Sequence, residues 1–169
     1  MNALLERAIR KQEADLGAPL DYLRDIANAS TSAFVKFGLF APLSQHRTVL
    51  PPDVWHLARL GATVAQDCGT CVQIVVNAAR ADGVPAPLLR DALGGEPLPA
   101  DPQLALDYGA AVATDADDVL ERVAAARDRF GDDGLVELAL AAATAQVFPL
   151  LKRGLGQAVA CARVQVDVE

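Results

Sequence analysis

An apolar run from Gly134 to Leu151, GLVELALAAATAQVFPLL, most strongly constrains how this chain folds. Alanine and leucine dominate the run, and both are strong helix formers. Glu137, Gln146 and Pro149 interrupt it, so it falls short of a membrane span and predicts a helix buried by neighbouring helices or by a second subunit. A carboxylate inside such a run needs a partner or a cavity, and we expect Glu137 to pair with an arginine across the bundle.

The composition extends this helical expectation to the whole chain. The 169 residues are 52% hydrophobic but only 5% aromatic, and small side chains allow helices to pack closely. Alternation typical of a strand is limited to a weak pattern at Val164–Val168. The length suits one domain with its own core, so we predict a single all-α domain over residues 1–169.

Proline and glycine divide the chain into helical segments. We predict N-terminal helices within about residues 2–48, a helical hairpin at about 51–83, and C-terminal helices within about 102–159. The individual helices are expected at 2–16, 21–37, from Pro51-Pro52-Asp53 to about 64, from the Cys68/Cys71 pair to about 82, and at 102–113, 116–129 and 132–159, with loops at 38–48 and 93–102 and a junction at Gly131.

Charge and cysteine content exclude several classes of protein. The net charge is −7 with both signs interspersed, so the chain lacks the basic surface that a nucleic acid requires. We find no secretion signal, and three cysteines make a poor disulfide framework for a chain of this size. We therefore expect a cytoplasmic protein that binds neither nucleic acid nor a membrane.

Two of the three cysteines lie in the motif Cys68-Gly69-Thr70-Cys71. Cysteines at this spacing fall on one face when they begin a helix, close enough for a disulfide. The helix N-terminus stabilises a thiolate, which is the reactive form, although the negative charge of Asp67 opposes it. The motif therefore predicts a redox pair that cycles between dithiol and disulfide at the N-terminus of a central helix.

Two other interpretations of the pair stay open. A structural zinc site needs four ligands, and only Cys161, His46 and His56 remain to complete one, so we expect no metal. Both thiols could instead be small core residues, because free cysteine is among the most buried residue types. We expect Cys161 to be such a core residue and His46 to be a solvated loop residue.

The segment from Pro51 to Pro85, PPDVWHLARLGATVAQDCGTCVQIVVNAARADGVP, resembles the carboxymuconolactone decarboxylase/alkylhydroperoxidase D-like superfamily. The family signature there is a Glu, a CxxC twelve residues later that opens a helix, and a His four residues after the second Cys. A looser likeness covers roughly residues 20 to 158. The resemblance implies an all-α fold that assembles as trimers or larger oligomers and, in the CxxC-bearing branch, a thiol peroxidase reduced by a dithiol partner.

Carried over by position, the resemblance makes Cys71 the thiol that attacks peroxide and Cys68 the thiol that resolves it as a disulfide. The proton relay of the family does not carry over. His56 stands where the family has Glu, and Val75 stands where it has His.

A helical hairpin offers His56 a way to replace the missing base. If the hairpin turns near Gln66 and Asp67, His56 lies opposite about Asn77, across an interaxial gap of about 8 to 10 Å. We hypothesise that the imidazole lies near Val75 and serves Cys71 as a base, oriented by Asn77 or Gln73. The alternative is a histidine that only packs beside Trp55.

The predicted function is a thiol-dependent peroxidase or disulfide oxidoreductase without a cofactor. Its partners would be a small peroxide, a dithiol reductant protein and further copies of the chain in a trimer or hexamer. The rival prediction is a non-catalytic helical oligomer or binding protein that keeps the fold without the relay. A carboxymuconolactone-type decarboxylase is disfavoured, because that branch does not depend on CxxC and the chain has no evident basic cluster for a lactone.

Overall fold

The computed structural model of the chain describes residues 3–157, 164 and 166. These residues form helices and no strands, which confirms the predicted all-α class. The helices are α1 (Ala3–Leu16), α2 (Asp21–Ala29), α3 (Thr31–Gly38), α4 (Phe40–Leu43), α5 (Pro52–Val64), α6 (Gly69–Ala81), α7 (Ala86–Gly94), α8 (Ala100–Thr114) and α9 (Val119–Gly154).

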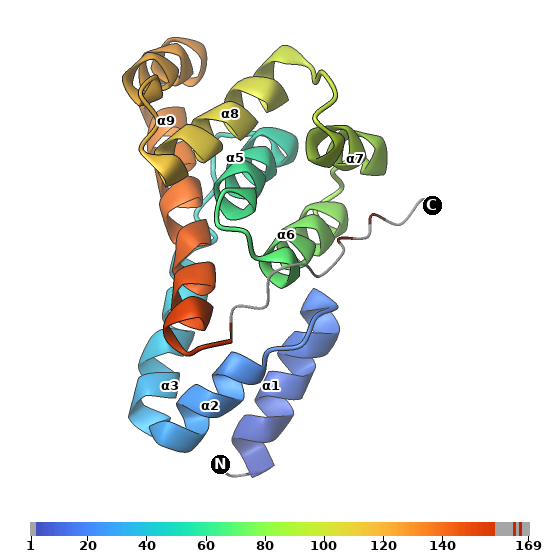
Figure 1. Cartoon of the computed structure of the whole chain (residues 1–169), viewed down its shortest axis with the longest axis vertical. Helices are drawn as coiled ribbons and strands as arrows, with labels where there is room; N and C mark the ends of the chain where they lie inside the picture. The colour runs from blue at the N-terminus through green and yellow to red at the C-terminus, as the bar shows by residue number, and fades with distance from the viewer. Residues whose placement is uncertain (1–2, 158–163, 165, 167–169) are drawn as a thin grey trace.

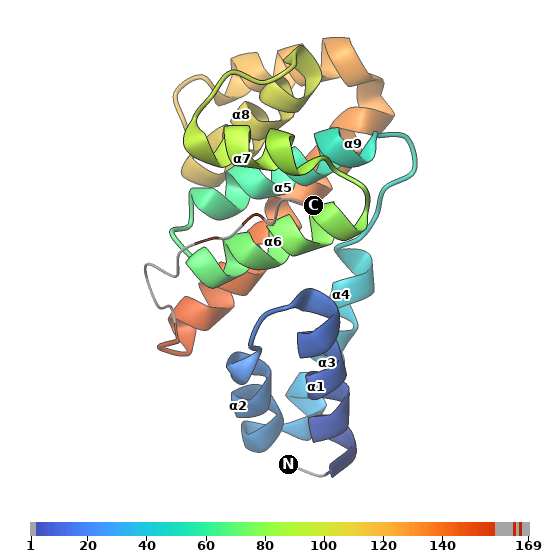
Figure 2. The ribbon, with the colours of Figure 1, turned by 90° about the vertical axis from the view of Figure 1, so that its right-hand side faces the viewer.

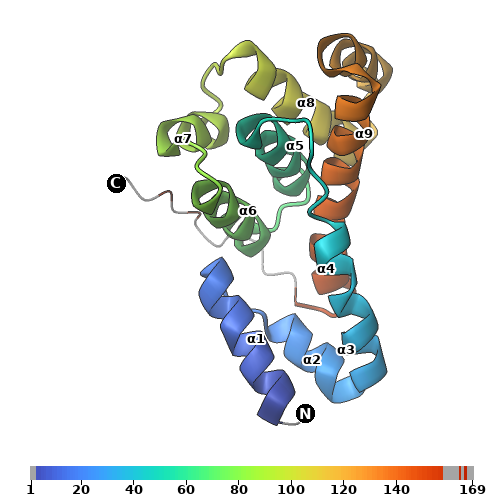
Figure 3. The same cartoon turned by 180° about the vertical axis from the view of Figure 1, so that it is seen from behind.

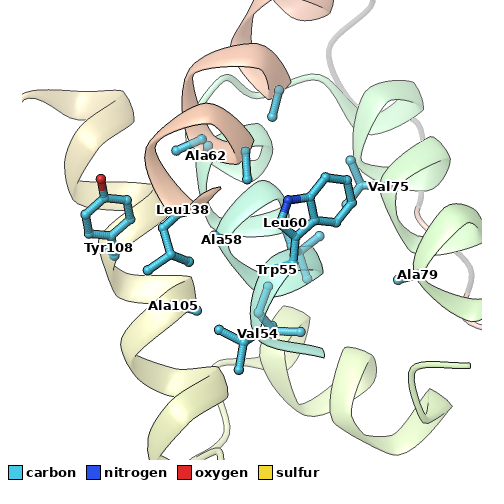
Figure 4. Packing of buried hydrophobic residues seen from close by; sticks show 14 of the residues in the cluster. Val54, Trp55, Ala58, Leu60, Ala62, Val75, Ala79, Ala105, Tyr108 and Leu138 are labelled. Atoms are coloured by element: carbon cyan, nitrogen blue, oxygen red, sulfur yellow. The ribbon is translucent and has the colours of Figure 1, made fainter. Parts of the chain in front are cut away.

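Helix α5 is the centre of the larger part of the molecule, with α6, α8 and α9 packed around it (Figures 1 and 3). Every residue from Val54 to Thr63 is buried, so this helix has no solvent-facing side over most of its length. The close-up shows the helices that cover it. Figure 4 labels Ala105 and Tyr108 of α8, Leu138 of α9, and Val75 and Ala79 of α6 around Val54, Ala58 and Leu60 of α5.

Two glycines allow α5 and α8 to approach closely. A Cβ atom at Gly61 would collide with the carbonyl oxygen of Leu106, and a Cβ atom at Gly109 would collide with the carbonyl oxygen of Ala58. Because backbone atoms are the obstacle, no side-chain rotation relieves either clash. The sequence therefore needs glycine at both positions to pack these helices at this distance.

The N-terminal helices α1, α2 and α3 form a second, smaller core at one end of the molecule (Figure 2). Ile9 and Leu23 are buried there, and Phe148 of α9 packs against them as part of the same cluster. Arg24 joins α1 to α2 through ion pairs with Glu6 at 3.2 Å and Glu13 at 2.6 Å. The C-terminal part of α9 therefore connects the two cores.

Ser30 divides the segment predicted as one helix over residues 21–37. Its backbone is extended (φ −159°, ψ 109°), and its hydroxyl accepts a hydrogen bond from the Ala33 N–H at 3.2 Å. Serine competes for backbone hydrogen bonds in this way, which ends α2 and caps α3. The loop predicted at 38–48 also contains a short helix, α4.

Helix α7 is absent from the sequence-based prediction. Its two prolines lie at the N-cap, Pro85, and in the first turn, Pro87, where a helix leaves its N–H groups unpaired anyway. Gly95 ends it in the left-handed region (φ 75°), as a C-terminal glycine commonly does. The predicted junction at Gly131 is confirmed, because its backbone (φ 72°, ψ −178°) kinks α9 there.

Glu137 does not pair with an arginine, which corrects the prediction. Its Oε1 accepts hydrogen bonds from the Thr48 N–H (2.6 Å), the Thr48 hydroxyl (2.6 Å) and the Val49 N–H (3.0 Å), and its Oε2 accepts one from the Leu50 N–H (3.0 Å). Burial raises the pKa of Glu137, but these hydrogen bonds lower it by more, and the pKa lies below its usual value. The buried carboxylate thus fastens the segment that enters α5 to the middle of α9.

Helix α9 contains the apolar run from Gly134 to Leu151. By length and composition alone, this helix of the described chain could cross a membrane. In its apolar window, however, 44% of the residues are buried inside the protein, and core helices of soluble proteins pass the same test. The structure is compatible with a soluble protein.

The C-terminal tail is described at two positions. Val164 and Val166 have no regular secondary structure and pack against the larger core. The other positions of the alternating pattern within 164–168 lie outside the described residues. Cys161, expected to be a core residue, also lies outside them.

Candidate functional site

Cys68 and Cys71 are bonded as a disulfide at the start of α6. Cys68 is the N-cap residue, Cys71 lies in the first turn, and their Cα atoms are 5.3 Å apart. Each is only 4% exposed. Asp67 precedes them in the left-handed region (φ 51°) and is exposed, so its carboxylate is in solvent rather than enclosed with the sulfur atoms. The first turn of α6 therefore holds the two cysteines within disulfide distance.

Cys71 borders a cavity of about 690 Å³ between the two cores. Cys71, Ile74, Val75 and Ala78 form the α6 part of its wall, as expected for positions on one helical face. The N-terminal helices and α9 complete the wall with mostly apolar side chains: Leu16, Leu20, Tyr22, Leu23, Phe34, Phe37, Ala145 and Phe148. One half of the disulfide therefore faces an apolar space, while Cys68 is outside this lining.

The polar part of the cavity wall is small. Helix α5 contributes Arg59 and Thr63, one helical turn apart, and the segment before α5 contributes Ser44 and Gln45. Helix α1 contributes Lys11, Gln12 and Asp15. Arg59 Nη1 donates to Gln45 Oε1 at 3.4 Å, and the Thr63 hydroxyl donates to the Arg59 carbonyl at 2.7 Å. An apolar space with a few fixed polar groups is typical of small-molecule sites.

The structure holds His56 at the far end of α6 from Cys71. His56 Nε2 lies 3.2 Å from Asp82 Oδ2, and Asp82 is the C-cap residue of α6. About 16 Å of helix separates Asp82 from Cys71, and about 10 Å separates it from Val75. His56 is also absent from the cavity lining. The hypothesis that His56 lies near Val75 and acts on Cys71 is therefore at odds with this geometry.

Burial decides the charge of His56. The ring is 3% exposed and packs edge-on against Trp55, with 4.8 Å between ring centroids. Burial, with a smaller effect of the Arg59 charge, lowers the pKa of His56 to about 4, although the hydrogen bond to Asp82 raises it. The imidazole is neutral at pH 7, and its Nδ1 is buried without a hydrogen-bond partner in the described part of the chain. The expected packing beside Trp55 is thus observed together with a polar contact that the sequence did not indicate.

The two residues expected to orient His56 connect other elements. Asn77 Nδ2 donates to the Leu16 carbonyl at 2.8 Å, and Gln73 Nε2 donates to Asn77 Oδ1 at 2.8 Å. These bonds tie a half-buried edge of α6 to the end of α1. The pair therefore helps to position the N-terminal helices over the cavity.

The remaining candidate ligands do not gather into a metal site in the described part of the chain. No group of three or more His, Cys, Asp or Glu side chains there is arranged to hold an ion. His46 is exposed, as predicted, and its carbonyl accepts a hydrogen bond from Trp55 Nε1 at 3.1 Å.

Sequence reasoning missed Arg59, the most unusual polar residue of the site. The sequence does not show that Arg59 is buried, because its burial depends on α5 being covered on all sides. A weak signal was present: Arg59 stands between Ala58 and Leu60 within a run of small and apolar residues. A cation in such a run needs an explanation in the tertiary structure.

No family model, curated protein or solved structure matches this chain. The fold and the geometry of the cavity therefore carry the functional argument. Together they define an all-helical protein with a disulfide at a helix N-terminus and an apolar cavity beside one of its sulfur atoms.

Proposed function

We propose that the chain is a thiol-dependent peroxidase or disulfide oxidoreductase of the alkylhydroperoxidase D-like type. One observation carries the proposal: Cys71 lines the apolar cavity while it is bonded to Cys68 at the N-terminus of α6. A substrate in the cavity would meet Cys71 first, which suits an attacking thiol. Cys68, outside the lining but within bonding distance, suits the resolving role.

The proposed reaction has two steps at the sulfur atoms. The Cys71 thiolate attacks one peroxide oxygen, so that an S–O bond forms, the O–O bond breaks, and the alkoxide leaves and takes a proton from water. The Cys68 thiolate then attacks the sulfenic sulfur, so that an S–S bond forms and hydroxide leaves. A dithiol protein restores both thiols by two exchange steps and departs as a disulfide.

The chain supplies the thiolate through the helix rather than through a neighbouring base. Cys71 lies in the first turn of α6, where unpaired N–H groups and the helix dipole stabilise negative charge. Val75 occupies the position of the family histidine, and His56 is bonded to Asp82 instead. We therefore assign no step to His56.

The test is a thiol count before and after one equivalent of peroxide is added to the reduced protein. We expect two of the three thiols to disappear and a Cys68–Cys71 crosslink to appear in the peptide mass spectrum. The C68S variant should retain a sulfenic acid at Cys71 that a dimedone probe traps, whereas the C71S variant should show no trapping. Three persistent thiols, with no peroxide consumed in the presence of a dithiol, would contradict the proposal.

The cavity supports a second candidate function, a non-catalytic binding protein for an apolar ligand. The absence of a base at Val75 favours it. The thiol count separates the two, because binding alone consumes neither peroxide nor thiols.

We also propose a cytoplasmic homo-oligomer, a trimer or hexamer, as the state of the protein. Val136, Leu140 and Leu150 support assembly, because they are large exposed aliphatic residues on one side of α9. Sedimentation velocity of the wild-type chain and of the L140E variant tests this. The wild type should sediment as an oligomer and the variant as a smaller species, whereas a monomeric wild type would contradict it.

A further inference from the structure

Arg59 is a buried cation that no carboxylate neutralises within the described residues. It is 6% exposed, and its Nε is buried without a hydrogen-bond partner among the residues that the structure describes. Within the described part of the chain, its side chain contacts Gln45, at the long distance of 3.4 Å, and the face of Trp55, with 4.5 Å from Cζ to the ring centroid. Arg24, which is more exposed, contacts the carboxylates of Glu6 and Glu13. A buried charge ordinarily needs such a partner.

Burial does not remove the charge of Arg59. It lowers the pKa of Arg59 to about 10, which leaves the guanidinium protonated at pH 7. The neighbouring His56 is neutral at that pH, so it leaves the net charge of the site unchanged. The site therefore carries a positive charge beside an apolar space, with an unfilled hydrogen-bond donor.

The cavity beside Arg59 suits one long apolar group. Its volume of about 690 Å³ falls within the range of about 300 to 1,000 Å³ that is usual for small-molecule sites. Leu20, Leu23, Phe34 and Phe148 supply aliphatic and aromatic surface on the sides formed by the N-terminal helices and α9. The other cation of the lining, Lys11, is exposed and already paired with Asp15 at 2.8 Å.

We propose that the cavity binds a monoanionic amphiphile, an unbranched alkyl chain that ends in a carboxylate. The carboxylate engages Arg59, and the chain lies against the leucines and phenylalanines of the wall. A guanidinium matches a carboxylate through two parallel hydrogen bonds, which would fill the donor at Nε. A single buried cation matches a single negative charge, whereas a phosphate monoester would bring a second charge with no partner.

This inference deepens the proposed function by naming its substrate class. Because Cys71 lines the same cavity, the peroxide reduced there would be a hydroperoxide of such an acid. That statement rests on the proposed function, but the binding of the amphiphile does not. Binding is therefore measured first, on protein in which the thiols cannot react.

The first experiment titrates the disulfide form with dodecanoate and, separately, with dodecanol. Trp55 is the one tryptophan of the chain and lies against Arg59, so its fluorescence reports occupancy. We expect saturable binding of dodecanoate, and in shorter acids we expect the affinity to fall by about fourfold for each methylene removed. Dodecanol should bind about tenfold or more weakly than dodecanoate. Equal affinity for the acid and the alcohol, or no saturable binding of the acid, would overturn the proposal.

The second experiment compares R59Q with R90Q, which changes an exposed arginine on α7. Calorimetry replaces fluorescence here, because the substitution at Arg59 itself alters the environment of Trp55. We expect R59Q to weaken dodecanoate binding by about tenfold to a hundredfold and R90Q to leave it unchanged. An equal affinity of both variants would refute the role of Arg59. If R59Q fails to fold, the acid and alcohol titrations of the wild type still decide.

The C68S/C71S double variant separates this inference from the proposed function. Dodecanoate binding to this variant, together with a wild type that loses no thiols to peroxide, would support the binding site and reject the peroxidase. Thiol loss in the wild type without dodecanoate binding would overturn the inference and leave the peroxidase.

Discussion

Replacing Glu137 by glutamine should destabilise the protein strongly, although the side chain keeps its size. In the native protein the carboxylate accepts four hydrogen bonds from Thr48, Val49 and Leu50. A glutamine whose oxygen replaces Oε1 keeps three of these bonds but turns its amide N–H groups toward the Leu50 N–H. That buried N–H then has no acceptor, which costs about 1 to 3 kcal/mol.

The loss of charge adds a second cost. Hydrogen bonds to a charged group contribute about 1.5 to 3 kcal/mol each, compared with about 0.5 to 1.5 kcal/mol for neutral partners. The three retained bonds therefore weaken, while the relief from burying a charge offsets part of the loss. The unpaired Leu50 N–H and the weaker hydrogen bonds destabilise E137Q, and the relief from burying a charge offsets part of this. We therefore expect the free energy of unfolding of E137Q to lie about 3 kcal/mol below that of the wild type.

Urea denaturation at several pH values measures this effect. With a slope of about 2 kcal/mol per molar urea, the midpoint of E137Q should fall by about 1.5 M at pH 7. The folded-state pKa of Glu137 is lowered, so its stabilisation is complete above the unfolded-state pKa and is lost as the pH falls through the folded-state pKa. The difference between wild type and E137Q should therefore shrink in acid.

The control is E96Q, which changes an exposed carboxylate after α7. It should alter the free energy of unfolding by less than about 0.5 kcal/mol. If E137Q is no more destabilising than E96Q at pH 7, or if its effect is unchanged at a pH well below the usual glutamate pKa, the anchoring role of Glu137 is refuted.

Three further predictions concern the helices around the site. The wild type should lose up to about 3 kcal/mol of stability as the pH falls from about 6.5 to 4, because the unfolded state protonates His56 at a higher pH than the folded state. In urea titrations, H56F should remove this dependence of stability on pH. An unchanged pH dependence in H56F would contradict the pKa of about 4. G109A should lower the free energy of unfolding by about 1 to 3 kcal/mol through its clash with the Ala58 carbonyl, whereas alanine should be tolerated at Gly94, where a Cβ atom makes only an ordinary contact with the Glu96 side chain. S30A should cost about 1 kcal/mol in thermal unfolding, because it removes the cap of α3, and a threonine there should restore most of it.

Sequence patterns predicted the local geometry of the Cys68/Cys71 pair but not the position of His56 relative to it. A CxxC next to a helical stripe predicts its own local geometry, since both cysteines lie within one turn. The expectation that His56 lies near Val75 depended on how α5 and α6 align. In the structure, the two helices align so that His56 contacts Asp82 instead. The identity of a contact across two helices depends on side-chain packing that the pattern does not specify.

The sequence alone determined the features that depend on neighbours along the chain. Helix-forming composition set the all-α class, and glycine at position 131 set the kink in α9, because these follow from backbone preferences within a few residues. Only the tertiary structure decided that Glu137 binds the entry to α5 and that Arg59 lies buried beside an apolar cavity. A charged side chain can form hydrogen bonds or ion pairs with many different groups. The tertiary structure determines which of these groups lies within reach, and the sequence does not.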